Sequence, residues 1–540
     1  MVLFIGIAAV MAAGPASAQN IRTYSAPDAT SACPYAVTID GASVPIEKLG
    51  EYQGAYYVRM ELKPDAHVRA RVALRFSVPC FFTLKPERFR TNVKSKGQSI
   101  EFDIDRPGPR VITAVAGSRE MWPLILLVDR WKDTPPPSGN VYQVSDYVSG
   151  AGVQTAGIQK ALDECPGKGG GTVVFAPGVY VTGSIFIRDN TRVVLSPGTL
   201  IRGSTDLNDY PVNKAPDSNA PGSGTSALVN FRNCKNSSVS GPGVIDGSGL
   251  VIRNEYGKHI RALLVIGSEN VAIEDVVLRN SPSWTCHLFN SKNVRIDGLK
   301  VLADWAIGNT DGIDADCSQD VTISNYFAFC GDDGLAIKTT TTAGPSKNIK
   351  MSDSVVMTHK TAFKIGTETL RDISNVLIEN CDAVSTGRGL GLYLLDGAEV
   401  SDITYRNVRL DLMEYPGERY GGSPFSASIG QRTGIGVMDG VTFENVTAQA
   451  PWYSDFSGQP SSPISNVTFR NCALAMANRC IKTEKLPVFN LKNCKGFAWQ
   501  DCTLEWKTPM LCLWDGLVKT ESSEKIETDG LNEVKPEAPK

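Results

Sequence analysis

The sequence predicts an all-β protein, a right-handed parallel β-helix preceded by a small N-terminal β-sandwich domain. Three observations lead to this fold class. Short segments with one apolar pattern recur along residues 270–469. Within each segment apolar and polar residues alternate, as in a strand with one buried face. Glycine and proline, 50 and 31 of 540 residues, supply turns between short strands.

The recurring segments begin with Asn, Asp or Gly, residue types that suit a bend with hydrogen bonds from side chain to backbone. They occupy residues 270–274, 293–297, 320–324, 348–352, 375–379, 402–405, 440–443 and 466–469. Most lie roughly 23 to 28 residues apart, which is typical of a solenoid. None has the 3.6-residue periodicity of a helix, so each coil is made of strands and turns. A β-propeller or a β-sandwich is the alternative, but propeller blades need roughly 40 to 50 residues each, and this period is too short.

The N-terminal part divides into three expected regions. Residues 1–18 fit a secretory signal peptide, because an apolar run leads into small residues before Gln19, although no Lys or Arg precedes that run. Residues 20–133 alternate in strand fashion, for example at 56–62 and 68–74, and are expected to form the β-sandwich. Residues 134–140 contain a run of prolines and are expected to be an extended linker.

The β-helix is expected over residues 141–518. Residues 155–164 have the spacing of a short amphipathic helix, which would cover the N-terminal mouth of the solenoid. The glycine-rich run 167–171 then opens the first strand. The polar, charged residues 519–540 are expected to form a disordered tail.

Charge and cysteine content narrow the function classes. A net charge of −3 offers no basis for nucleic-acid binding. No segment is apolar and long enough to span a membrane. Thirteen cysteines are compatible with an oxidising compartment, and we expect a secreted or periplasmic protein. Cys472, Cys480, Cys494, Cys502 and Cys512 either form bridges that close the C-terminal end or are buried thiols. No CxxC pair is present, which argues against structural zinc.

Three carboxylates are the main candidates for catalysis. Asn309-Thr310-Asp311-Gly312 and Gly331-Asp332-Asp333-Gly334 lie about twenty residues apart, so the repeat puts them on adjacent strands of one sheet. Cleavage of a glycosidic bond needs one protonated carboxyl for the leaving oxygen and one ionised carboxylate. Neighbouring aspartates in a cleft do not easily ionise together, so their pKa values are pushed apart.

The same chain resembles the polygalacturonases of glycoside hydrolase family 28, from about Val141 onward. The motifs that carry this resemblance are residues 169–180, 195–200, 241–247 and 281–284, together with the Asn309 and Gly331 motifs. The resemblance implies a monomeric, inverting hydrolase of a polysaccharide with no cofactor and no metal. It also implies that Asp332 is the general acid, and that Asp311 and Asp333 position and activate the water. In inverting enzymes generally, wide carboxylate spacing leaves room for that water.

Two departures from the family pattern concern the substrate. Thr361 falls where the family has the histidine of a Gly-His-Gly element, and His359 lies two residues earlier, which keeps the same face on a strand. Residues 391–393, Gly-Leu-Tyr, stand in place of the Arg-Ile-Lys element that grips a substrate carboxylate. Either the sugar next to the cut is neutral or rhamnose-containing, or cations come from other positions.

Candidate substrate-binding residues follow from these departures: Asn309, Lys338, His359, Lys364 and Tyr393, with Arg388 as a further cation. A tyrosine ring suits the apolar face of a sugar, as do Trp284 and Trp305.

Three alternatives remain open. A β-sandwich joined to a β-helix with three aspartates also resembles the dextranases of glycoside hydrolase family 49, which act on neutral α-glucans. A polysaccharide lyase or a non-catalytic carbohydrate-binding protein can use the same scaffold. A lyase would need a calcium cluster and a base beside a carboxylate, and a binding protein would be expected to have lost an acid. The preferred prediction is therefore hydrolysis of a pectic polysaccharide.

Overall fold

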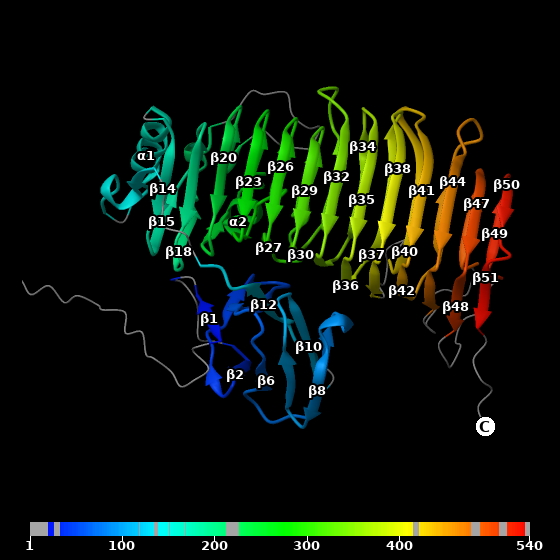
Figure 1. The fold of residues 1–540 in the computed structure, drawn as a ribbon, viewed down its shortest axis with the longest axis horizontal. Coiled ribbons are helices and arrows are strands. Elements are labelled where there is room, and N and C mark those ends of the chain that lie inside the picture. The colour runs from blue at the N-terminus through cyan, green and yellow to red at the C-terminus, as the bar shows by residue number, and fades with distance from the viewer. Residues whose placement is uncertain are drawn as a thin grey trace, which may run out of the picture. The chain divides into compact units, whose positions relative to one another are not determined.

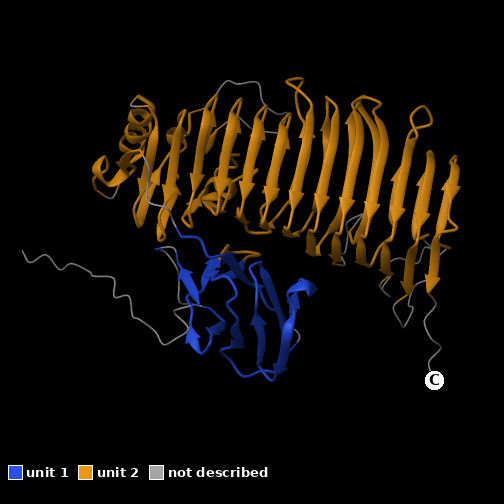
Figure 2. Ribbon diagram, viewed as in Figure 1, with its two compact units in different colours: residues 1–48, 55–135 blue, residues 49–54, 136–540 orange. Residues whose placement is uncertain are grey.

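The computed structural model describes residues 20–25, 27, 33–117, 119–133, 139–150, 152–167, 169–211, 226–413, 421–476, 487–506 and 516–534. The predicted signal peptide at 1–18 and most of the predicted linker lie outside the described residues. The chain divides into two compact units, Met1–Lys48 with Ala55–Pro135, and Leu49–Gly54 with Pro136–Lys540 (Figure 2). Each unit has a hydrophobic core of its own.

The first unit is a β-sandwich of two mostly antiparallel sheets. The larger sheet contains β1 (Ile21–Tyr24), β4 (Glu47–Leu49), β5 (Ala55–Leu62), β7 (Cys80–Lys85), β10 (Arg110–Ala116), β11 (Arg119–Glu120) and β12 (Leu124–Arg130). The smaller contains β2 (Tyr35–Ile39), β3 (Ala42–Ser43), β6 (Val68–Leu74), β8 (Thr91–Lys96) and β9 (Ser99–Ile104), and the 3-10 helix η2 (Glu87–Phe89) follows β7. Val58 and Leu126 of one sheet share a core with Val72 and Phe102 of the other. The predicted sandwich is present.

The second unit is a parallel β-helix in which three sheets run along the solenoid (Figure 1). Its first sheet contains β13 (Asn140–Gln143), β14 (Gly171–Phe175), β17 (Thr191–Leu195), β20 (Lys235–Ser240), β23 (Glu269–Glu274), β26 (Lys292–Asp297), β29 (Gln319–Ser324), β32 (Ser346–Ser352), β35 (Ile373–Glu379), β38 (Glu399–Arg406), β41 (Val437–Glu444), β44 (Ile464–Arg470), β47 (Cys494–Gln500) and β50 (Glu524–Glu527).

Each coil continues into the second sheet. That sheet contains β15 (Gly178–Thr182), β18 (Thr199–Gly203), β21 (Val244–Asp246), β24 (Val277–Arg279), β27 (Lys300–Leu302), β30 (Phe327–Cys330), β33 (Val355–Thr358), β36 (Asp382–Thr386), β39 (Arg409–Leu412), β42 (Thr447–Ala450), β45 (Ala473–Met476), β48 (Cys502–Trp506) and β51 (Leu531–Val534).

The third sheet carries the candidate site. It contains β16 (Ile185–Ile187), β19 (Ala227–Arg232), β22 (Arg261–Ile266), β25 (Cys286–Phe289), β28 (Ile313–Asp316), β31 (Leu335–Thr339), β34 (Thr361–Thr369), β37 (Arg388–Asp396), β40 (Ser423–Gly434), β43 (Ser454–Ser457), β46 (Phe489–Lys492) and β49 (Val518–Glu521). The helical segments of this unit are η3 (Val144–Asp146), α1 (Thr155–Gly167), η4 (Leu207–Asp209) and α2 (Gly249–Asn254).

The repeat found in the sequence is the first sheet. Val271, Val294, Val321 and Ile349 of successive repeats pair directly across neighbouring parallel strands. Because the coils are in register, identical apolar positions stack inside the solenoid and form one continuous core. The predicted parallel β-helix is therefore confirmed.

The residue that opens each repeat has a left-handed backbone conformation. Asn270, Asn293 and Asn348 have φ values of 57°, 53° and 56°, and Gly440 has 73°. Asn, Asp and Gly tolerate this region best, which explains why they recur there. The asparagines also bond to one another between coils, as in Asn293 Nδ2 to Asn270 Oδ1 at 2.6 Å. The side chains thus bond along the solenoid, whereas the sequence led us to expect bonds to the backbone.

The two ends of the β-helix differ in how well the sequence predicted them. Helix α1 buries Ile158, Ala161, Leu162 and Cys165 against the first coils, so the predicted amphipathic helix covers that end. The disordered tail predicted at 519–540 is wrong for the residues up to 534, because β49, β50 and β51 add one more strand to each sheet. Exposed, charged side chains made this last coil look like a tail, since only Leu531 among them is buried.

The described cysteines are free thiols, and Cys472, Cys494 and Cys502 are buried within the last coils. Of the two interpretations, buried thiols therefore apply to these three, while Cys480 and Cys512 lie outside the described residues. Within the described part of the chain, no helix combines the length and apolar character needed to cross a membrane.

Candidate active site

The three aspartates lie on two stacked turns at the start of neighbouring strands of the third sheet. Asp311 precedes β28, and Asp332 and Asp333 precede β31. The two strands pair in parallel with Ile313 opposite Leu335. One oxygen of each of the three carboxyl groups lies within 4.8 Å of the others. The structure thus brings together the constellation that the sequence predicts.

The glycines after these aspartates allow the turns to approach closely. Gly312 donates its N–H to Asp333 O at 2.9 Å. A Cβ on Gly312 would lie 1.9 Å from the Tyr326 hydroxyl and 2.4 Å from Gly334 O. A side chain at this position would therefore force the two acid-bearing turns apart.

Asp332 is half-buried, with one face toward the cleft. Its Oδ2 accepts the Asn309 N–H at 3.0 Å, and its Oδ1 accepts the Asp333 N–H at 3.0 Å. Burial and the neighbouring Asp333 charge raise the pKa of Asp332. A carboxyl group that keeps its proton and faces a cleft is suited to act as a general acid.

Asp333 is buried, with 2% of its surface exposed, and both of its oxygens are bonded to β34. Oδ2 lies 2.5 Å from Lys364 Nζ, and Oδ1 accepts the Thr361 N–H at 3.1 Å. Burial alone would raise the pKa of Asp333, but the Lys364 ammonium outweighs it and lowers that pKa. Asp332 and Asp333 therefore have opposite pKa shifts, as an acid and base pair requires.

Asp311 belongs to a second charged group. Its Oδ2 lies 3.9 Å from Lys338 Nζ, which pairs more closely with Asp314 Oδ1 at 2.8 Å. Burial and the Asp314 charge raise the pKa of Asp311 well above its usual range. Burial likewise raises the pKa of Asp314, to about 6. Among the predicted water-activating pair, Asp333 is thus the carboxylate held ionised.

The close approach of the acids does not support the argument from wide spacing. Inverting enzymes generally hold their two carboxyl groups roughly 6.5 to 9.5 Å apart. Here oxygens of all three lie within 4.8 Å, and the Lys364 ammonium already neutralises Asp333. The stereochemical outcome thus stays a prediction based on the family resemblance, and so does the absence of a metal.

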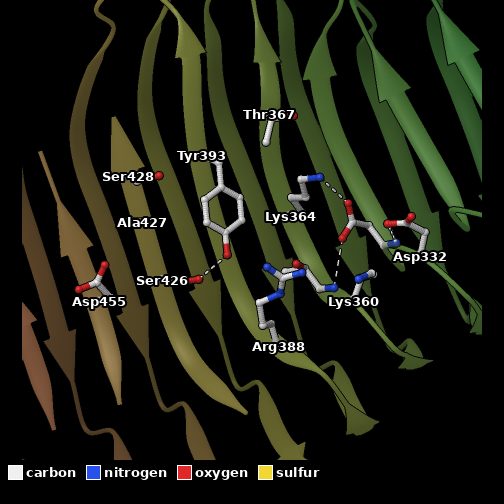
Figure 3. A pocket seen from close by; sticks show the side chains of 12 residues that line it. Asp332, Lys360, Lys364, Thr367, Arg388, Tyr393, Ser426, Ala427, Ser428 and Asp455 are labelled. Carbon is white, nitrogen blue, oxygen red and sulfur yellow. Dashed lines mark hydrogen bonds and ion pairs between the residues drawn. The ribbon is translucent and has the colours of Figure 1, made fainter. Parts of the chain in front are cut away.

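Two adjoining pockets meet at the acids. The larger, of about 370 Å³, extends along β34, β37, β40 and β43 and is lined by Asp332, Asp333, Lys360, Thr361, Lys364, Thr367, Arg388, Tyr393, Ser426, Ala427, Ser428 and Asp455 (Figure 3). The smaller, of about 170 Å³, lies on the other side and is lined by His259, Ser283, Trp284, Asn309, Asp311, Asp332, Asp333, Lys338, Lys364, Thr367 and Glu368. Asp332, Asp333, Lys364 and Thr367 line both, so the two pockets form one cleft with the acids at its middle.

Four of the five predicted substrate-binding residues line this cleft. Asn309, Lys338, Lys364 and Tyr393 do so, and the Tyr393 hydroxyl lies 2.5 Å from Ser426 Oγ (Figure 3). His359 is not among the lining residues, because its ring packs on Trp305 at 4.1 Å between centroids. It lies in the turn before β34, where the alternation of a strand does not apply.

The tryptophans named as sugar platforms are largely occupied by protein groups. Trp305 stacks on Phe329 at 4.7 Å, and Trp284 has the Lys338 ammonium 3.9 Å from its ring centre. Trp284 still lines the smaller pocket. Sequence reasoning missed Lys360, Ser426 and Glu368, which line the cleft because the coils stack.

Comparisons with known proteins agree with this architecture. A family model described as "Glycosyl hydrolases family 28" matches residues 213–495. A probable polygalacturonase of Vitis vinifera is 25% identical over 365 residues, 63% of this chain and 74% of that protein. An endo-polygalacturonase of Pectobacterium carotovorum subsp. carotovorum is 23% identical over 351 residues, 59% of this chain and 84% of that protein.

Solved structures support the fold. The family 28 exopolygalacturonase of Yersinia enterocolitica has a TM-score of 0.58 at 16% identity, over 90% of this chain and 99% of that one. The exopolygalacturonase of Thermotoga maritima has a TM-score of 0.57 at 19% identity, over 69% of this chain and 93% of that one. At these identities the likeness shows the fold alone.

Proposed function

The chain belongs to glycosyl hydrolase family 28, and from that premise we propose that it hydrolyses glycosidic bonds of a pectic polysaccharide. The observation that carries the proposal is the meeting of Asp311, Asp332 and Asp333 within 4.8 Å at the middle of one cleft, where Lys364 contacts Asp333 and the pKa shifts of Asp332 and Asp333 are opposite. Polygalacturonases among its relatives make a pectic polymer the first substrate to test.

In the proposed mechanism Asp332 donates its proton to the leaving glycosidic oxygen while Asp333 removes a proton from the attacking water. Asp311 is within 4.8 Å of both and holds the water through its Oδ1, which accepts no hydrogen bond from the described residues. Attack and departure in one step invert the anomeric centre. Proton NMR of the first product formed tests this, since a retained anomer would contradict a single displacement.

The substrate sugar next to the acids is proposed to be a uronate bound by Lys360 and Arg388. Both side chains line the larger pocket within two coils of Asp332 (Figure 3). An arginine can bind a carboxylate through two parallel hydrogen bonds, and a lysine adds a point charge. Lys360 and Arg388 would take over the role of the family's Arg-Ile-Lys element, in whose place this chain has Gly-Leu-Tyr at residues 391–393.

A second candidate is a polymer in which uronate and neutral sugars alternate, as in rhamnogalacturonan. It is favoured by the surface beyond Arg388, where Tyr393, Ser426 and Ser428 present a ring and hydroxyl groups rather than cations. Such groups suit a neutral sugar. A neutral α-glucan is less well matched, because it gives Lys360 and Arg388 no charge to bind.

A panel of polygalacturonate, rhamnogalacturonan and dextran tests the substrate class through the release of reducing ends. We expect turnover of a pectic polymer and none of dextran. Cleavage of dextran alone would overturn the proposal, and ultraviolet absorbance of an unsaturated product would identify a lyase.

Location and assembly are part of the proposal. We propose that this enzyme acts outside the cytoplasm, as a secreted or periplasmic monomer, because residues 1–18 fit a secretory signal peptide and the expected substrate is a polysaccharide. Fractionation of cells and gel filtration of the purified protein test the two statements separately.

A further inference from the structure

Lys364 occupies a position prepared by small residues on both sides. It pairs with Ala336 on the preceding strand β31 and with Gly391 on the following strand β37. Phe363 and Ile365 point into the core, so Lys364 between them points outward into the cleft. The short neighbours leave room for its side chain to reach Asp333 Oδ2, 2.5 Å away.

Gly391 is required by the ring of Tyr393. A Cβ at Gly391 would lie 2.7 Å from Tyr393 Cε2 and 3.0 Å from Thr361 Cγ2. The resemblance places the family's clamp arginine at this position. An arginine here would displace the Tyr393 ring, and it would stand directly beside Lys364 on the neighbouring strand, whose backbone is about 4.8 Å away. Glycine at position 391 therefore leaves room both for the Tyr393 ring and for the Lys364 side chain on the neighbouring strand.

Residues of strand β34 bond both carboxylate oxygens of Asp333. Lys364 Nζ bonds one and the Thr361 N–H bonds the other, at 2.5 and 3.1 Å. Asp332, by contrast, receives its hydrogen bonds from the backbone of Asn309 and Asp333. The lysine thus acts on one member of the acid pair by direct contact and on the other only at longer range.

We propose that Lys364 is a positioning residue that holds Asp333 ionised and oriented, in place of the histidine that family members carry at the Thr361 position. Its primary role is not to bind substrate. The inference rests on the proposed function, because it assigns Asp333 as the base of that reaction. Burial supports it, since the Lys364 side chain is only 16% exposed and its charge is directed at Asp333.

The titratable groups around Asp333 include cations, which lower its pKa, and acidic groups, whose negative charge raises it. Those that face it are Lys364 on β34, Lys338 on β31, Arg388 on β37, Asp314 on β28, the turn residues Asp311 and Asp332, and the buried thiol of Cys330. The Lys364 ammonium makes a direct contact with this carboxylate, at 2.5 Å.

The first test is the pH profile of kcat/KM for Lys364→Met, Lys364→Arg and the wild type. Loss of the charge should move the acid-side limb upward by about 1 to 3 pH units, because Asp333 then ionises later. Lys364→Arg keeps the charge and should leave the limb near its wild-type position. A matched control is Lys350→Met, which removes another lysine 2.5 Å from a carboxylate, Glu379, on the first sheet. A raised KM with unmoved limbs would overturn the proposal and identify Lys364 as a substrate-binding group.

The second test needs no substrate. In Lys364→Met the buried Asp333 charge loses its contact with the Lys364 ammonium and keeps only the Thr361 N–H, so the melting temperature should fall more at about pH 7 than at about pH 4, where Asp333 can take up a proton. An equal fall at both pH values would overturn the proposal. If the wild type cleaves none of the panel, the proposed function fails while this readout still judges Lys364. Lys364→Gln serves both tests if the methionine variant does not fold.

Discussion

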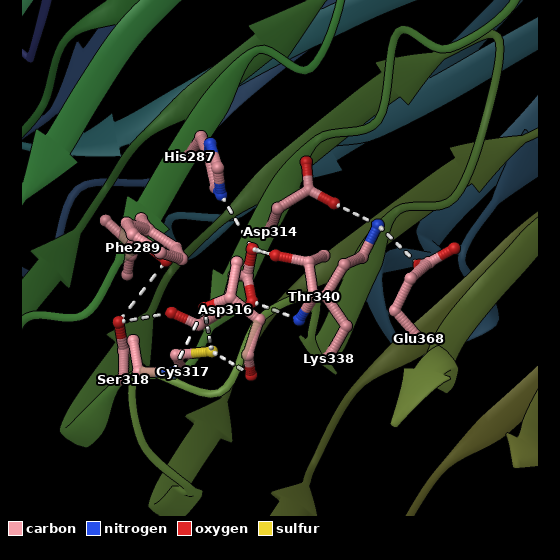
Figure 4. Close-up of polar contacts among 12 residues, drawn as sticks. His287, Phe289, Asp314, Asp316, Cys317, Ser318, Lys338, Thr340 and Glu368 are labelled. Atoms are coloured by element: carbon pink, nitrogen blue, oxygen red, sulfur yellow. Dashed lines mark hydrogen bonds and ion pairs between the residues drawn. The ribbon is translucent and has the colours of Figure 1, made fainter. Parts of the chain in front are cut away.

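Two groups of acids on the third sheet show how differently the same side chain can be used. Asp332 and Asp333 lie in turns at the start of β31 and line the cleft. Asp316 ends β28 and is completely buried. It accepts the Thr340 N–H at 2.9 Å, the Thr340 hydroxyl at 2.6 Å and His287 Nε2 at 3.2 Å (Figure 4).

The hydrogen bonds of the buried Asp316 are all made with other buried groups of the protein. Arg261 Nε donates to His287 Nδ1 at 2.9 Å, so the ring proton lies on Nε2 and is donated to Asp316. Burial lowers the pKa of His287 to about 4, which keeps the ring neutral. Burial would raise the pKa of Asp316, but the bonds from His287 and Thr340 lower it.

The cleft acids differ in that some of their capacity for hydrogen bonds is left unused. Asp311 Oδ1 is buried and accepts no hydrogen bond from the described residues. Asp332 keeps an exposed face. Asp316 contacts only buried groups of the fold, whereas Asp332 and Asp333 line the cleft beside the unbonded Asp311 oxygen, where a water or a substrate oxygen can reach them.

The largest effect is expected for Asp332→Asn, because an amide cannot donate the proton that the leaving oxygen needs. We expect kcat to fall roughly 10²- to 10⁴-fold with an unchanged melting temperature. The matched control is Asp320→Asn on the first sheet, where neighbouring coils already carry asparagine at the equivalent position. Turnover at the wild-type rate in Asp332→Asn would rule out its role as general acid.

The pH dependence of the wild type tests the same pair. Activity needs ionised Asp333, whose pKa is lowered, and protonated Asp332, whose pKa is raised. The kcat/KM profile should therefore rise as pH climbs through the first pKa and fall as it climbs through the second. Each limb should change about tenfold per pH unit. A profile without an alkaline fall would contradict a protonated Asp332.

Asp316→Leu should damage the buried group without touching the chemistry. It leaves donors of His287 and Thr340 without acceptors, which should cost about 3 kcal/mol of unfolding free energy, measured by urea denaturation. Asp316→Asn should cost less, because its oxygen still accepts from Thr340. If kcat of the folded variants fell as far as in Asp332→Asn, the contrast between the two groups would be wrong.

The smallest effect is expected along the asparagine ladder. Asn293 has φ of 53° and bonds Asn270 across the coils. Asn293→Ala should cost about 1 kcal/mol from the left-handed conformation and the lost bond. Asn293→Gly should cost less, since glycine adopts this conformation freely. Equal losses would show that the ladder, rather than the backbone, sets the residue type.

Several features of the fold could be predicted because they are periodic. In each repeat the alternating apolar residues indicate the buried face of a strand, and the Asn, Asp or Gly before them indicates a bend. The strands of the first sheet can therefore be predicted from the spacing of the repeats. The last coil was missed because its strands are exposed and charged, and they are recognisable only by their pairing with β46, β47 and β48. Local pattern does not contain that pairing.

The candidate site was predicted in part for a related reason. Asp311, Asp332 and Asp333 stand in compact motifs before strands of known period, so their meeting could be expected. Lys360 has no such motif and was missed, Arg388 was named only as a further cation, and His359 was misplaced because a turn interrupts the strand before Thr361. Residues brought together by stacking of coils leave no local signal in the sequence.

The sequence by itself determined that this chain forms stacked parallel coils and that three aspartates share one edge of a sheet. This was possible because coils that stack in register bring residues one repeat apart in the sequence next to one another in space. The tertiary structure added the physical reason why the pKa of Asp332 is raised while that of Asp333 is lowered. That division depends on Lys364 lying 2.5 Å from Asp333 and on the burial of Asp332, and both distance and burial arise from packing between coils.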